Sequence, residues 1–140
     1  MTGLWVAWVL GVTLYPDSGR STVNLVPLRE HGQAVHCLLS NCSAAGRAAR
    51  FLIVDVLGNW LVFLPIGFSL VGALGNLPGR RRLQTAIALA AVLSVSIELM
   101  QLAIPNRTTD VDDVLFNTMG AATGAVFMMA TQHWVNYGGD

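Results

Sequence analysis

Nine polar side chains are spaced along three long apolar segments or close to their ends. They are Asp55, Asn59, Glu98, Gln101, Arg107, Asp110, Asp112, Asp113 and Asn117. Polar groups are costly within a hydrocarbon environment, so where they occur they mark candidate functional positions. Carboxyl groups accept hydrogen bonds or hold hard cations, a guanidinium binds phosphate or carboxylate, and amides supply neutral hydrogen bonds. This set of side chains therefore predicts a ligand-binding cluster.

The elements that position these side chains are strongly apolar. Phe51 to Leu74 contains one acid, Asp55, and Leu83 to Ile104 contains one, Glu98. A third segment runs from Val114 to Trp134. A helix of about 20 residues crosses a hydrocarbon core of about 30 Å. With 54% apolar and only 11% charged residues, the chain has the composition of a membrane protein.

A fourth apolar segment, Leu4 to Tyr15, is too short to cross a bilayer unaided. We expect helices near residues 3–15, 51–74, 83–104 and 112–134. The predicted fold is all-α, an integral membrane bundle of about four transmembrane helices, with a long outer loop (16–50) after the first. Residues 1–140 form a single domain, which we expect to lie in the cell membrane as a multi-pass protein.

The turn Gly75 to Arg82 contains three consecutive arginines, and we expect it in the cytoplasm by the positive-inside rule. A raw count opposes this, because four arginines lie in the loop 16–50 and Arg107 falls on the same side. Three arginines within eight residues beside two membrane ends should nevertheless outweigh dispersed ones. The loop 16–50 and the connection 105–113 are then outside, where the polar ends of the three helices meet. Cys37 and Cys42 would lie where disulfides persist, and the sequence leaves open whether they pair. Their spacing is not that of a zinc site, and we predict no metal site.

Each of the three long helices carries its polar residues along one stripe. Asp113, Asn117, Gly120 and Gly124 share a face of the last helix, and the small-x-x-x-small spacing of the glycines predicts a close helix contact. We expect Arg107 to contact Asp110 or Asp113. Ordinary structural roles are also open, because aspartates at a helix start can cap it and amides can join helices.

Four short motifs occur in an order that resembles the VanZ-like membrane family. They are Asn24-x-x-Pro27, Gly58-Asn59 followed by Phe63-x-Pro65-x-Gly67, Glu98-x-x-Gln101, and Arg107-x-x-Asp110-x-x-Asp113-x-x-x-Asn117-x-x-Gly120. The resemblance covers about Asn24 to Gly124. It implies an all-helical integral membrane protein of the bacterial envelope, in a family named for resistance to the glycopeptide antibiotic teicoplanin.

Three functions remain open. The first is binding of a lipid head group or cell-wall precursor at the outer cluster (Asn59, Glu98, Gln101, Arg107, Asp110, Asp113 and Asn117), which would modify glycopeptide access. The second is a metal-dependent membrane enzyme acting on a lipid-linked phosphate, with Glu98, Asp110 and Asp113 as metal ligands. The third is proton or ion transport, which would need several copies of the chain.

Other features narrow the choice of function and partners. No activated nucleophile and no phosphate-binding glycine loop is evident, which favours a protein that is not an enzyme, and no cofactor is predicted. A net charge of zero provides no basic surface for nucleic acid. The expected partners are membrane lipids and the ligand itself, and a homo-oligomer stays open.

Overall fold

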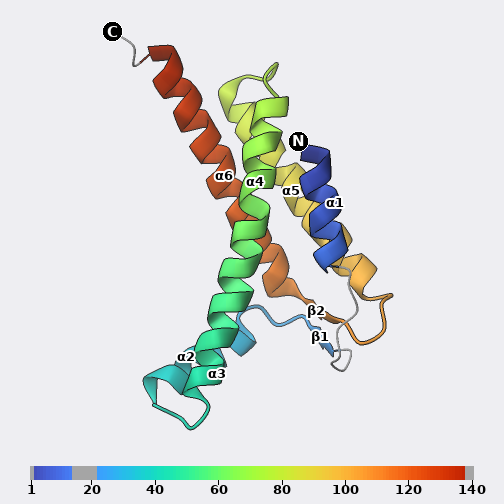
Figure 1. The fold of residues 1–140 in the computed structure, drawn as a ribbon, viewed down its shortest axis with the longest axis vertical. Coiled ribbons are helices and arrows are strands. Elements are labelled where there is room, and N and C mark those ends of the chain that lie inside the picture. The colour runs from blue at the N-terminus through green and yellow to red at the C-terminus, as the bar shows by residue number, and fades with distance from the viewer. Residues whose placement is uncertain (1, 14–21, 138–140) are drawn as a thin grey trace.

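A computed structural model describes residues 2–13 and 22–137 (Figure 1). In chain order the elements are α1 (Thr2–Thr13), β1 (Thr22–Asn24), α2 (Arg29–Leu39), α3 (Ala45–Leu52), the π-helical turn η1 (Ile53–Leu57), α4 (Gly58–Ala73), α5 (Gly79–Gln101), β2 (Thr108–Asp110) and α6 (Val111–Tyr137). The chain is mostly helical, as predicted. Residues 14–21, where the expected outer loop begins, lie outside the described residues.

Three helices are long and apolar enough to span a membrane: Ala45–Ala73, Gly79–Gln101 and Val111–Val135. The first is continuous through α3, η1 and α4, so it begins at Ala45 and not at Phe51 as predicted. Hydropathy located only its apolar part. The preceding residues are rich in Ala and Arg, which are strong helix formers, and they extend the helix beyond the apolar segment.

The packing of α4 against α6 depends on small residues. A Cβ atom on Gly120 would overlap the backbone of Trp60, and one on Gly124 would overlap that of Leu64. On the opposing helix, a Cβ on Gly67 would overlap the backbone of Ala121. The predicted helix contact at Gly120 and Gly124 is therefore confirmed, and the two backbones approach each other as only glycine permits.

The helix α1 lies alongside the bundle and contributes to its core (Figure 1). Val9 is buried together with Phe63, Ile66 and Ile97, and the Trp5 indole N–H donates to the carbonyl of Val62 at 3.0 Å. At 12 residues, α1 is shorter than a membrane span. Its crossing of the membrane stays a prediction.

The described part of the expected outer loop is largely folded. It contains β1, α2 and the start of α3, and β1 pairs in parallel with β2 from Thr22↔Thr108 to Asn24↔Asp110. These strands depart from the predicted all-α fold. Each has three residues, too few to produce a recognisable alternation of apolar and polar side chains.

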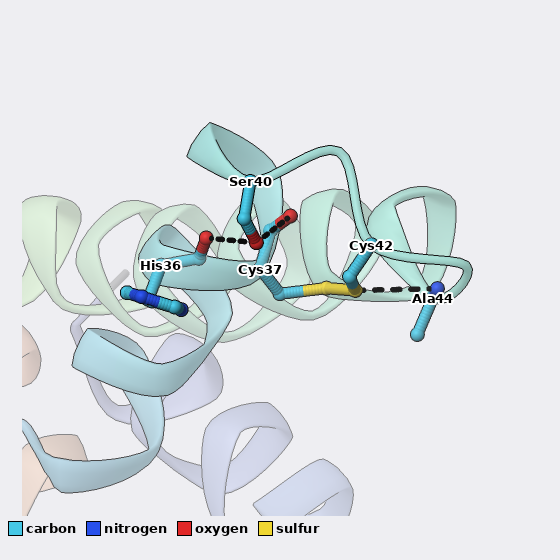
Figure 2. Close-up of a disulfide and its surroundings, with 5 residues drawn as sticks. All are labelled: His36, Cys37, Ser40, Cys42 and Ala44. Carbon is cyan, nitrogen blue, oxygen red and sulfur yellow. Dashed lines mark hydrogen bonds between the residues drawn. A yellow bond between two sulfur atoms is a disulfide. The ribbon is translucent and has the colours of Figure 1, made fainter.

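A disulfide closes the connection between α2 and α3 (Figure 2). It joins Cys37 to Cys42, which the sequence had left open. Close to it, the Ser40 hydroxyl donates to the carbonyl of His36 at 2.8 Å. The backbone N–H of Ala44 donates to the sulfur of Cys42 at 3.3 Å.

The opposite end of the bundle holds the short turn between α4 and α5, as predicted (Figure 1). Arg82 folds back over this turn and donates to the carbonyl of Gly75 and to the side chain of Gln132, each at 2.8 Å. The strands and α2 therefore lie at one end of the molecule, and the arginine turn lies at the other.

Candidate functional site

His31 of α2 lies between two carboxyl groups from different elements. Its Nδ1 is 2.9 Å from Asp112 at the start of α6, and its Nε2 is 2.9 Å from Asp55 in η1. The rings of Phe51 and Phe116 lie about 5 Å from the imidazole, with centroid distances of 5.1 and 5.0 Å. His31 is buried, and it joins the outer helix α2 to two membrane helices.

This arrangement constrains the number of protons at the site. A neutral imidazole has one donor nitrogen and one acceptor nitrogen, so it cannot donate to two carboxylates. Both contacts are hydrogen bonds only if the imidazole is doubly protonated or one carboxyl group keeps its proton. Two hydrogen bonds from His31 within this Asp55–His31–Asp112 triad would thus require one proton more than a neutral imidazole and two carboxylates carry.

Asp112 is fully buried, and backbone groups complete its hydrogen bonding. Its two oxygens accept from the backbone N–H of Leu28 at 2.8 and 3.0 Å. Its own N–H donates to the side chain of Asp110 at 2.9 Å. Asp110 thus caps the first turn of α6, one of the structural roles that the sequence left open.

Asp110 also joins β2 to its neighbours. Its carboxyl group accepts from the Asn24 side chain at 3.0 Å, which fastens β1. Its backbone N–H donates to Glu98 at 3.0 Å. The buried Glu98 carboxyl of α5 therefore receives a hydrogen bond from the connection that leads into α6.

The remaining predicted residues lie on the facing sides of the same helices. The Asn59 side chain donates to Asp113, and the Asn117 side chain donates to Ser94 at 2.9 Å. Gln101 is buried at the end of α5. Asn117 therefore joins α5 to α6 one turn further from the strands, as the helix-joining role of amides predicts.

A polar cavity of about 310 Å³ opens beside the triad. Four carboxyl groups, one guanidinium, one hydroxyl and one aromatic ring line it: Glu30, Asp55, Asp110, Asp113, Arg107, Thr108 and Phe51. Arg107, Asp110 and Asp113 thus share this cavity, as the sequence suggested. A direct contact of Arg107 with either acid stays a prediction.

The turn η1 is the local feature that carries Asp55. It is a π-helical turn of five residues inserted between two α-helical stretches. Such turns are rare and occur often at functional sites, because the extra residue rotates the following side chains. Asp55 leaves the helix within this turn and reaches His31.

Sequence reasoning did not find the centre of the site. His31 was absent from the predicted cluster, and Asp112 was placed at this end but not among the predicted binding residues. The contacts of His31 join residues 24 and 81 positions apart. No spacing rule connects such positions. Within residues 2–13 and 22–137, no group of three His, Cys, Asp or Glu side chains is arranged to hold a metal ion.

One protein family matches most of the chain. A model of the VanZ/LLP1 family matches residues 3–132. No curated protein and no solved structure shows a significant match.

Proposed function

The chain belongs to the VanZ/LLP1 family, and from this and the site geometry we propose that it is a multi-pass protein of the bacterial cell membrane that binds a polar head group. The binding site is the cavity lined by Asp55, Arg107, Asp110 and Asp113. The observation that carries the proposal is this cavity at one end of a bundle whose three long helices can span a membrane.

The lining of the cavity favours one kind of head group. Among the described residues of the lining, four carboxyl groups accompany one guanidinium, so hydrogen-bond acceptor groups outnumber donor groups. Such a surface suits hydroxyl, amide and amine donors, and it disfavours a head group that offers only phosphate. A cell-wall precursor, with its sugar hydroxyls and peptide amines, fits this requirement.

Two features support an outward orientation of the cavity. The disulfide lies at the cavity end of the chain, and disulfides persist outside the cytoplasm. The turn with Arg80, Arg81 and Arg82 lies at the other end, where the positive-inside rule places it in the cytoplasm. Binding of a precursor outside the membrane would reduce the access of glycopeptide antibiotics to it, which is the resistance link that we propose.

A direct binding measurement tests the proposal. The probe is a lipid-linked disaccharide-peptide cell-wall precursor, titrated into purified protein in detergent. We expect saturable binding, weakened about tenfold or more in Asp55→Asn and in Asp113→Asn, because each replaces a carboxyl oxygen that can accept a hydrogen bond with an amide nitrogen that can only donate. The control is Arg50→Ala, an exposed residue of α3 outside the cavity, which should bind as the wild type does. Equal binding by all four proteins would refute the cavity as the site.

The triad supplies one observation in favour of a membrane enzyme. Asp112 contacts Nδ1 of His31 while Nε2 faces Asp55, an arrangement that can orient a general acid or base. In this second proposal the protein cleaves a lipid-linked phosphate. Phosphate release that is abolished in His31→Gln would support it, and its absence in the wild type would exclude it for the substrate tested.

A further inference from the structure

An apolar groove adjoins the polar cavity at β2. This apolar groove has a volume of about 320 Å³ and lies between the β1 segment, the end of α5 and the start of α6. The apolar side chains that define it are those of Val23, Leu25, Val95, Leu99, Leu102 and Val114. Asp110 lines both the groove and the polar cavity.

The groove lies at the depth of the hydrocarbon chains of one leaflet. Val95, Leu99 and Leu102 form a single stripe on α5, and they are 44, 61 and 53% exposed. This stripe occupies the last two turns of a membrane-spanning helix whose other end carries the arginine turn. In the orientation proposed above, hydrocarbon chains of the outer leaflet are the medium that this stripe would contact.

The β1 segment forms the wall of the groove opposite α5. Val23 is 58% exposed and Leu25 is 73% exposed, although both are apolar. Pairing of β1 with β2 and the bond from Asn24 to Asp110 hold this segment in place. These hydrogen bonds therefore hold the apolar side chains of Val23 and Leu25 in exposed positions, where contact with water would not stabilise them.

Two acids lie along the groove without making it polar. Glu98 accepts from the backbone N–H of Asp110, and Asp110 accepts from Asn24 and from the N–H of Asp112. These carboxyl oxygens are turned toward protein donors, so apolar atoms dominate the lining. Water is not retained in a space lined in this way, whereas a hydrocarbon chain fills it favourably.

We propose that the groove holds one hydrocarbon chain of a lipid from the outer leaflet, so that the ligand of the polar cavity is a lipid-linked molecule and not a soluble one. This inference rests on the proposed function. The chain lies against Leu99 and Leu102, and the head group enters the cavity past Asp110, where the two spaces adjoin. Selection of a lipid-linked ligand then depends on the groove, and recognition of its head depends on the cavity.

Photo-crosslinking tests occupancy of the groove. The probe is phosphatidylglycerol with a diazirine at the end of one acyl chain, in vesicles that contain the reconstituted full chain. The groove is filled by Leu99→Trp, and separately by Val95→Trp one turn away. The matched control is Val92→Trp, on the same helix and 63% exposed but outside the groove. We expect labelling at residues 95–114 to fall about fivefold or more in the groove variants and to be unchanged in the control.

Other labelling patterns would overturn the inference. Equal labelling of the wild type and all three variants would show only general contact with lipid. Crosslinks between two copies of the chain through the groove, with no lipid label, would show that a second copy covers it.

A binding comparison separates this inference from the proposed function. The lipid-linked precursor and its soluble disaccharide-peptide are each titrated into the wild type and Leu99→Trp. The inference predicts tighter binding of the lipid-linked form to the wild type, and loss of that advantage in Leu99→Trp. Equal binding of both forms to both proteins overturns the inference alone, whereas binding of neither form to the wild type overturns the proposed function as well.

Discussion

The buried imidazole of His31 holds α2 in place at the cavity end of the molecule. It is 5% exposed, and its contacts reach two membrane helices through Asp55 and Asp112. Breaking such a buried pair is costly because the group left behind is buried without its partner. His31 therefore stabilises the packing of α2 against the long helices. Its partner Asp55 also lines the polar cavity.

Replacing His31 should lower stability far more than replacing its neighbour on the same helix. We expect His31→Ala to reduce the free energy of unfolding by about 3 kcal/mol, because Asp112 is left fully buried. The control is His36→Ala, an exposed position that should change it by less than about 0.5 kcal/mol. Unfolding in detergent measures both variants, and similar losses in the two would contradict the clamping role.

Among the residues that the structure describes, Arg107 is the one arginine that lines the polar cavity. We expect Arg107→Ala to weaken binding of the lipid-linked precursor about tenfold, since a charged hydrogen-bond donor is lost. Arg50→Ala, which is exposed and outside the cavity, removes the same charge and should leave binding unchanged. Titration of both variants compares them, and an equal loss would indicate a general electrostatic effect.

At the scale of elements, α4 and α6 determine how closely the bundle can pack. Gly67, Gly120 and Gly124 each face backbone atoms of the opposing helix, so no side chain separates the two helices there. This contact holds Asn59 of α4 near Asp113 of α6. The glycines therefore also determine the geometry of the polar site, which begins within two turns of Gly120.

Adding one methyl group should lower the stability at one helical glycine and raise it at another. Gly120→Ala forces the added methyl against the backbone of Trp60, and we expect a loss of about 2 kcal/mol in stability. In Gly58→Ala, at the start of α4, the added methyl group meets nothing within 4 Å. We expect this variant to gain about 0.5 to 1 kcal/mol in stability. Thermal unfolding in detergent distinguishes them, and a stable Gly120→Ala would show that the helices can separate at no cost.

The disulfide acts on a single element pair, α2 and α3. It closes a short loop, because the two cysteines are separated by five positions in the sequence, and the loop-entropy relation then gives about 2 kcal/mol. We expect Cys37→Ser with Cys42→Ser to raise amide exchange in α2 and α3 while exchange in α5 and α6 is unchanged. A uniform rise across the bundle would mean that the disulfide supports the whole fold.

For the whole molecule, the length of the helices and the position of the charges define its relation to the membrane. Ala45–Ala73 is 29 residues long, which at about 1.5 Å per residue exceeds a hydrocarbon core of about 30 Å. The excess, α3, carries Arg47 and Arg50 and packs against α2. We therefore expect the α2–α3 pair to extend into the aqueous layer at the cavity end.

Cysteine labelling tests the orientation of the whole molecule. In a background with Cys37 and Cys42 replaced by serine, we expect Ser43→Cys to react with an impermeant maleimide added to intact cells. Gly79→Cys, in the arginine turn, should react only after the membrane is permeabilised. The reverse pattern would place the polar cavity in the cytoplasm and remove the proposed link to glycopeptides.

The sequence by itself determined the long helices and the end of the bundle where the polar residues gather. Apolar length and helical period are local properties, so Asn59, Glu98, Asp110 and Asp113 could be assigned to one end without a structure. The close approach at Gly120 followed from the same period. The start of α3 was missed because an Ala- and Arg-rich stretch is helical without being apolar.

Only the tertiary structure decided how that end is built. The pairing of β1 with β2 and the placement of His31 between Asp55 and Asp112 join residues up to 86 positions apart. Neither contact leaves a pattern within either segment, because the partner that stabilises each polar group comes from another element. Burial then makes those partners necessary, since a polar side chain enclosed by helices must find its hydrogen bonds inside the protein.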